Sequence, residues 1–165
     1  MTFDKRAEAV GKIGFTERQA RFLVTVMPHS GVCVPRQYAT FAGIVHGQKT
    51  RKFFAKLVRL GYGSMYDCRH NRARIYHVNQ RALYKAIGEA DSRLRRPLTL
   101  SHAIQRLMVL DAIVEDPNLV WLGTAEEKGP TPDRADADSR RALQHTNLVT
   151  ECQNLQLESR TGSAH

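Results

Sequence analysis

The sequence is poor in the features that mark membrane-spanning and secreted proteins. No run of about 18 or more apolar residues occurs, so no membrane-spanning helix is expected. The first residues, "MTFDKRAEAVGKIGF", lack the apolar core of a secretory signal peptide, so none is expected. The three cysteines, Cys33, Cys68 and Cys152, are scattered and odd in number. This usage predicts reduced thiols and a cytoplasmic location rather than a disulfide framework.

Motifs that bind nucleotides or build catalytic triads are also missing. The chain has no phosphate-binding glycine loop, no dinucleotide-binding glycine motif and no Ser/His/Asp order. We therefore expect a protein without catalysis or cofactor. The candidate metal ligands are spaced unlike a zinc pair, so no metal site is expected either. These candidates are His29, Cys33, Cys68, His70 and His77.

One minor enzymatic alternative stays open. Asp116 is followed ten positions later by Glu126-Glu127-Lys128. An acid followed by acid-x-lysine resembles the pattern of metal-dependent nucleases, in which carboxylates hold Mg²⁺ and the lysine supports the attacking water. The motif is short, and it should lie on a strand pair. A metal-dependent nuclease is therefore a weaker alternative to a binding protein.

Positive charge is concentrated in the first half of the chain. Residues 1–81 hold 15 Lys and Arg against 4 Asp and Glu, a net charge of +11. Residues 82–165 hold 10 against 12, a net charge of −2. A basic half joined to a nearly neutral half indicates nucleic acid or another anionic surface as partner.

The residue pattern predicts three helices and a hairpin in that basic half. Thr16 with Gln19 forms a capping box for a helix over 16–28, "VCV" at 32–34 suits a brief strand, and Pro35 suits the start of a second helix. The third helix, 47–60, gathers its cations in an arc of about 80° beside an apolar arc of about 160°. Two β-rich runs, "SMYDC" and "ARIYHV", flank the polar tip "RHNR" as in a hairpin.

The second half changes character along its length. A fourth helix is predicted to about Gly88, and a stronger one, apolar on more than one side, over 101–116. From residue 129 the chain is polar and has no aromatic residue, which is typical of disorder. The change also fits a chain that has lost a second domain. We expect a flexible lead-in at 1–14, a DNA-binding domain at 15–80, a helical extension at 81–128 with a possible homodimer interface, and a disordered tail at 129–165.

This order of elements resembles the winged helix-turn-helix DNA-binding domain. The opening Gly14-Phe15-Thr16-Glu17-Arg18-Gln19, with a basic third helix after it, more narrowly resembles the replication-relaxation family of plasmids and integrative elements. The resemblance covers residues 16–79. It implies a mainly α fold with a small β-hairpin, in which residues 47–60 are the recognition helix and 69–74 the wing tip.

Double-stranded DNA is accordingly the expected partner, bound in transcription regulation or in plasmid or mobile-element replication or transfer. Gln48 could pair with adenine, and Arg51 or Lys52 with guanine, at the start of the third helix. The candidate DNA-binding residues are Arg36, Gln48, Lys49, Thr50, Arg51, Lys52, Lys56, Arg59, Arg69, Arg72 and Arg74. Two alternatives stay open: a winged helix that binds proteins, and RNA binding through Tyr62, Tyr66 and Tyr76.

Overall fold

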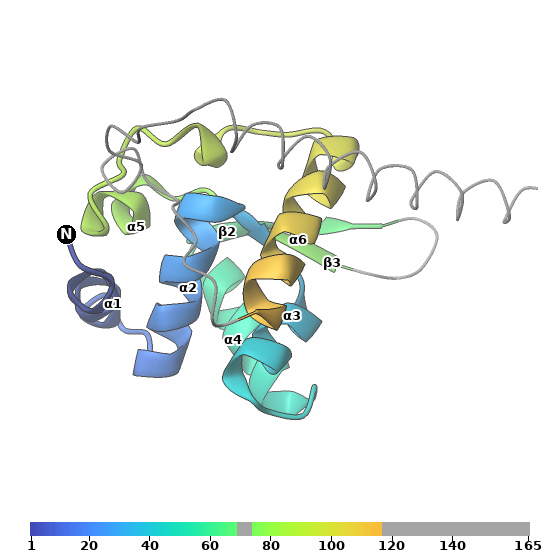
Figure 1. The fold of residues 1–165 in the computed structure, drawn as a ribbon, viewed down its shortest axis with the longest axis horizontal. Helices are drawn as coiled ribbons and strands as arrows, with labels where there is room; N and C mark the ends of the chain where they lie inside the picture. The colour runs from blue at the N-terminus through green and yellow to red at the C-terminus, as the bar shows by residue number, and fades with distance from the viewer. Residues whose placement is uncertain (69–73, 117–165) are drawn as a thin grey trace, which may run out of the picture. The chain divides into compact units, whose positions relative to one another are not determined.

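The computed structural model describes residues 1–68 and 74–116 (Figure 1). The chain divides into two units, Met1–Glu127 and Lys128–His165, and all described residues belong to the first. This unit is mainly helical with a small three-stranded antiparallel sheet, which confirms the predicted fold class. Within the described ranges, no helix is long and apolar enough to cross a membrane. The expected disordered tail, 129–165, lies outside the described residues.

The first segment corrects a prediction, because residues 1–14 are not a loose lead-in. Phe3–Gly11 forms helix α1, which packs against the next helix and buries Arg6, Ala7 and Val10. Asp4 pairs with Arg21 across this contact at 2.8 Å. The sequence pattern did not predict this helix, because its buried face consists of only three residues and one of them is an arginine.

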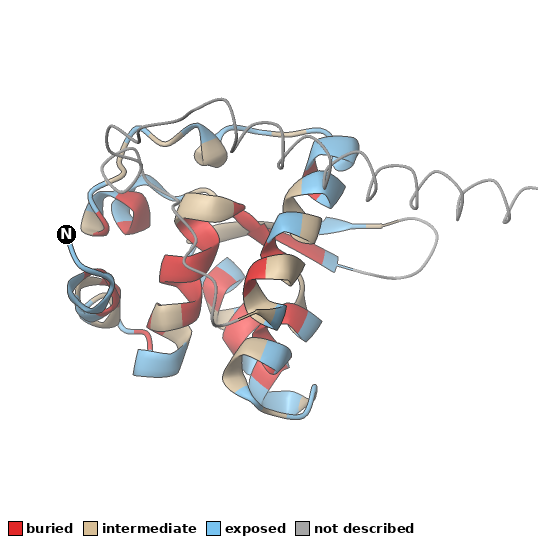
Figure 2. Cartoon of the chain, viewed as in Figure 1, coloured by how far each residue is buried: buried red, intermediate tan, exposed pale blue. Residues whose placement is uncertain are grey.

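Helix α2, Glu17–His29, is the centre of the fold. Its capping box forms as predicted: the Gln19 N–H donates to Thr16 Oγ1 at 3.4 Å, and the Thr16 N–H donates to Gln19 Oε1 at 3.2 Å. Every residue from Phe22 to Met27 is buried, so the helix is covered on all sides. Figure 2 shows this concentration of buried residues on α2 and on the faces of the surrounding elements that turn toward it.

The predicted strand and hairpin join in one sheet. Strands β1 (Val32–Cys33), β2 (Gly63–Asp67) and β3 (Arg74–Val78) lie in the order β1-β3-β2. His77 of β3 stands opposite Val32 on one side and Ser64 on the other. The short first strand therefore pairs with the last one, and β2 with β3 forms the hairpin. The tip of the hairpin, residues 69–73, lies outside the described residues.

Two helices joined by a short turn follow β1. Helix α3, Pro35–Ala42, begins at its proline and ends where Gly43 takes a left-handed conformation with φ 60°. An L-residue with a side chain seldom adopts that conformation, so glycine suits this position. Helix α4, Gln48–Arg59, starts five residues later and contacts both α3 and β2. The sequence placed both helices correctly.

The remaining elements, which the sequence places in a helical extension, pack on the core of the domain before them. Helix α5 (Arg81–Ala86), the 3-10 helix η1 (Arg93–Arg95) and helix α6 (Leu100–Glu115) complete the described fold. Leu83, Tyr84, Ile87 and Leu110 belong to the same core as α2. Helix α6 contacts α2, α3 and β1, so residues 81–116 are part of one core. It also leaves Leu100 and Ile104 exposed, and the homodimer through this helix stays a prediction.

Candidate nucleic-acid interface

The inner face of α4 fixes how this helix presents its charges. Thr50, Phe53, Phe54 and Leu57 are each at most 1% exposed. The Phe53 ring lies 4.5 Å from that of Tyr38, and the Phe54 ring lies 4.4 Å from that of Tyr76, measured between centroids. Aromatic contacts from α3 and from the sheet therefore hold α4 at one rotation about its axis.

The opposite face of α4 is polar and cationic. Gln48, Lys52, Ala55 and Arg59 recur at i, i+4, i+7 and i+11, which places them on one line, with Arg51 beside it. All five are exposed. Their centre is an alanine, so the helix backbone can approach another molecule closely between the longer side chains.

These charges have no compensation nearby. Residues 18–66 contain eight Lys and Arg and not one Asp or Glu. The two flanking arginines are neutralised by acids from elsewhere: Arg21 by Asp4 of α1, and Arg36 by Asp111 of α6. Among the described residues, the α4 cations have no ion pair. The uncompensated field is therefore concentrated on α4, where it attracts anions.

Thr50 corrects the predicted set of DNA contacts. Its side chain is fully buried, with 0% exposure, and its hydroxyl oxygen has no hydrogen-bond partner among the residues that the structure describes. The helical period puts residue 50 on the same side as Phe53, Phe54 and Leu57 rather than on the line through Gln48. Thr50 is a core residue and cannot reach a base.

Arg36 is held by the body of the protein. One guanidinium nitrogen lies 2.6 Å from Asp111 Oδ2. Its neighbour Gln37 is buried and donates from Nε2 to both the Leu107 carbonyl and Asp111 Oδ1, each at 2.9 Å. Arg36 therefore helps to join α3 to α6, and a phosphate contact would have to compete with this ion pair.

Lys56 also points back to the protein. Its Nζ donates to the Gly14 carbonyl and lies 5.1 Å from the centroid of the Phe15 ring. Lys49 lies on the same flank of α4, about two turns earlier, and lines a groove beside this helix. The arc of four cations predicted from sequence is therefore divided: Lys52 and Arg59 face outward, and Lys49 and Lys56 lie on the side toward α2.

The predicted wing is described only in part. Arg74 begins β3, and its Nε lies 3.2 Å from Asp67 Oδ1 across the hairpin, with both side chains largely exposed. An exposed pair of this kind contributes little to stability and opens readily for another anion. Arg69 and Arg72 lie outside the described residues.

The described residues offer little support for a metal site, a reactive thiol or RNA binding. In residues 1–68 and 74–116, no three His, Cys, Asp or Glu side chains lie close enough to hold a metal ion. Burial raises the pKa of the Cys33 thiol, which makes it less reactive. Tyr76 is buried and Tyr62 packs on Phe15, so only Tyr66 keeps an exposed ring for stacking. The acid-x-lysine motif at 126–128 lies outside the described residues.

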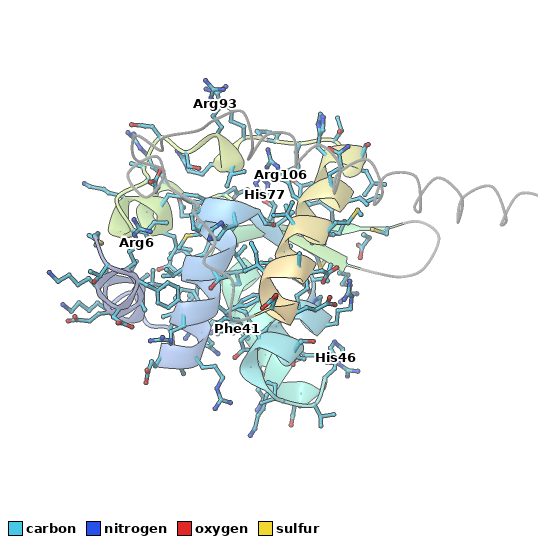
Figure 3. All side chains as sticks on the ribbon, in the orientation of Figure 1. Arg6, Phe41, His46, His77, Arg93 and Arg106 are labelled. Atoms are coloured by element: carbon cyan, nitrogen blue, oxygen red, sulfur yellow. The ribbon has the colours of Figure 1, made fainter. Side chains whose placement is uncertain are left out.

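Sequence reasoning missed one hollow beside α4. A groove of about 800 Å³ lies between the start of α2, the end of α3 and the start of α4. Phe41, labelled in Figure 3, is one of the residues that line it. Its lining consists of Thr16, Glu17, Arg18, Gln19, Arg21, Tyr38, Phe41, Ala42, Ile44, Lys49 and Lys52. Three segments build this groove, so only the tertiary structure brings its residues together.

The chain was compared with models of protein families, with curated proteins and with solved structures, and none of the three comparisons gave a match.

Proposed function

We propose that this protein binds double-stranded DNA through a winged-helix domain, with α4 as the recognition helix and the β2–β3 hairpin as the wing. The order of elements supports this proposal: helix, short strand, two helices and a hairpin, with the short strand paired to the last strand of the hairpin. The two helices α3 and α4 are joined by a short turn, as in a helix-turn-helix motif.

The observation that carries the proposal is the outward face of α4. It offers Gln48, Arg51, Lys52 and Arg59 without any acidic partner among the described residues. The field around this face is not cancelled, because residues 18–66 contain no acid. Duplex DNA is the common cellular anion that accepts a helix lengthwise, in a major groove about 12 Å wide.

The arrangement assigns different tasks to the two ends of α4. In helix-turn-helix proteins the first residues of the recognition helix read base edges, so Gln48, Arg51 and Lys52 are the candidates for base contacts. Gln suits adenine, and Arg or Lys suits guanine. Ala55, at the centre of the outward face, is small enough to let α4 lie deep in the major groove of DNA. Arg59, at the far end, and Arg74, on the hairpin, are candidates for phosphate contacts.

DNA binding without catalysis suits a regulator of transcription, or a factor in replication or transfer of a plasmid or mobile element. In both roles the domain positions other machinery on DNA. Both roles would use α4 in the same way, so we propose duplex binding by this helix and do not choose between the roles.

The test is binding of the full chain to a fluorescent duplex of random sequence across a salt series. Two triple variants with equal loss of charge are compared: Arg51→Ala/Lys52→Ala/Arg59→Ala on α4, and Lys5→Ala/Lys85→Ala/Arg93→Ala elsewhere. All six side chains are exposed, and Figure 3 shows Arg93 at the opposite end of the fold from His46 in the α3–α4 turn.

Each lost phosphate contact lowers the slope of log K against log salt by about 0.9, so the α4 variant should lose about 0.9 through Arg59, and its affinity should fall further through the loss of Arg51 and Lys52. The control variant should keep nearly the full slope and affinity. Absence of binding at low salt, or equal losses in the two variants, would contradict the proposal.

A further inference from the structure

The groove beside α4 combines an apolar surface with a cationic one, and binding of DNA would use only the cationic surface. Its lining includes three partly exposed apolar residues, Phe41, Ala42 and Ile44, which we call its floor. Its rim is cationic, formed by Arg18 of α2 and by Lys49 and Lys52 of α4. Arg21 also lines the groove, but its guanidinium is held by Asp4 at 2.8 Å and lies 4.9 Å from the Phe3 ring centroid.

We propose that this groove binds an acidic segment of a partner protein, with a bulky apolar side chain of that segment on Phe41, Ala42 and Ile44. Charge complementarity carries the choice of occupant. Arg18, Lys49 and Lys52 have no ion pair among the described residues, while Glu17 is the only acid in the lining. Acidic side chains on both sides of an apolar anchor would meet a cation on both the α2 side and the α4 side.

The floor decides against duplex DNA as the occupant of the groove. A phosphate backbone offers charge and no apolar side chain, so it would cover Phe41 and Ile44 without any gain from their burial. A protein segment buries its apolar anchor there, and the removal of that side chain from water favours binding. Docking of an apolar side chain into a groove between helices is also a common mode of peptide recognition.

The position of the groove couples it to α4. Lys52 lines the groove and also belongs to the outward line of α4. An acidic segment in the groove would cover this lysine and place negative charge next to Gln48 and Arg51. We therefore expect the bound segment to weaken binding of duplex DNA, a consequence that rests on the proposed function. Binding of the segment itself does not depend on that function.

The experiment uses the full chain and a short fluorescent peptide with glutamates on both sides of a Leu-Trp-Leu centre, followed by fluorescence anisotropy. Two control peptides replace either all glutamates by glutamine or the Leu-Trp-Leu centre by serines. Two protein variants divide the surfaces: Arg18→Glu/Lys49→Glu alters the rim of the groove, and Arg51→Ala/Arg59→Ala alters the outward face of α4. These four side chains are exposed, so both variants should fold, which circular dichroism checks.

The acidic apolar peptide should bind the unaltered chain, and the Arg18→Glu/Lys49→Glu variant should bind it at least about tenfold more weakly. Both control peptides should bind at least about tenfold more weakly as well. The Arg51→Ala/Arg59→Ala variant should keep peptide binding while it loses duplex binding, so the two proposals can fail separately. Equal binding of the serine control would show attraction by charge alone and would overturn the groove proposal, as would absence of peptide binding at high micromolar concentration.

Discussion

Helices α4 and α6 both combine charged and apolar residues, but they direct their charges in opposite ways. On α4 the cations Arg51, Lys52 and Arg59 face away from the protein and have no ion pair among the described residues. On α6 two charged groups turn inward: Asp111 binds Arg36 and Gln37 of α3, and one guanidinium nitrogen of Arg106 is buried.

The contrast shows that charge alone does not mark a binding surface. Arg36 and Arg51 look alike in the sequence, and each lies in the first turn of a helix of the basic half. Arg36 is neutralised by Asp111 from outside that half, whereas Arg51 has no ion pair among the described residues. An arginine with a partner holds helices together, and an arginine without one is available for an anion from outside.

The largest expected effect comes from the inner face of α4. Phe53→Ala should lower the free energy of unfolding by about 3–5 kcal/mol, because a buried aromatic ring is lost and a cavity remains. Urea unfolding measures this loss. Lys52→Ala, on the outward face, is the control and should stay within about 0.5 kcal/mol. A similar loss of unfolding free energy in both variants would contradict the division of α4 into a buried inner face and an outward face.

The next effect concerns the contact between α3 and α6. Gln37→Ala removes its bonds to Leu107 and Asp111, and also the bond that Gln37 Oε1 accepts from the Val34 N–H at 2.9 Å. The free energy of unfolding should fall by about 2 kcal/mol, since buried polar groups lose their partners. Gln48→Ala is the matched control on α4 and should change stability little. Equal values would show that the α3–α6 contact does not depend on this side chain.

A pH dependence tests the second inward charge of α6, that of Arg106, through the buried His77 of β3. Burial lowers the pKa of His77, and the nearby Arg106 lowers it further, although the Leu94 carbonyl at 2.8 Å from Nε2 opposes the shift. The unfolded chain therefore takes up a proton at about pH 6.5 that the folded chain takes up only at lower pH. Stability should be complete above pH 6.5 and should fall as the pH drops below it.

Urea unfolding of the unaltered chain and of His77→Gln, at neutral and mildly acidic pH, isolates this contribution from the other histidines. The variant should lose less stability on acidification than the unaltered chain. An identical loss in the two proteins would show that His77 does not contribute.

The smallest expected effect is a gain. Thr50→Val replaces a buried hydroxyl, which has no hydrogen-bond partner in the described part of the chain, by a methyl group of nearly the same shape. It should raise the free energy of unfolding by about 1 kcal/mol. Thr40→Val, at an exposed position of α3, is the control for the change in propensity. A lower free energy of unfolding for Thr50→Val, or a reduced DNA affinity in this variant, would contradict the placement of Thr50 in the core.

Much of the described fold could be predicted because it depends on neighbours in sequence. The capping box at Thr16, the proline start of α3 and the period of α4 each involve residues a few positions apart. Helix α1 could not be predicted in this way, because its short buried stripe gains stability through its contacts with α2 and α5. The packing of residues 81–116 on the preceding domain could not be predicted for the same reason: Tyr84 and Leu110 share a core with residues far earlier in the chain.

For the candidate site, the sequence alone determined that α4 has an apolar and a cationic side, because a helix of fixed period must sort its residues by angle. Only the tertiary structure decided which cations remain available. Asp111 meets Arg36 across 75 residues, Gly14 meets Lys56 across 42, and three separate segments enclose the groove. Local spacing cannot specify such pairs, because they depend on how the helices pack around α2.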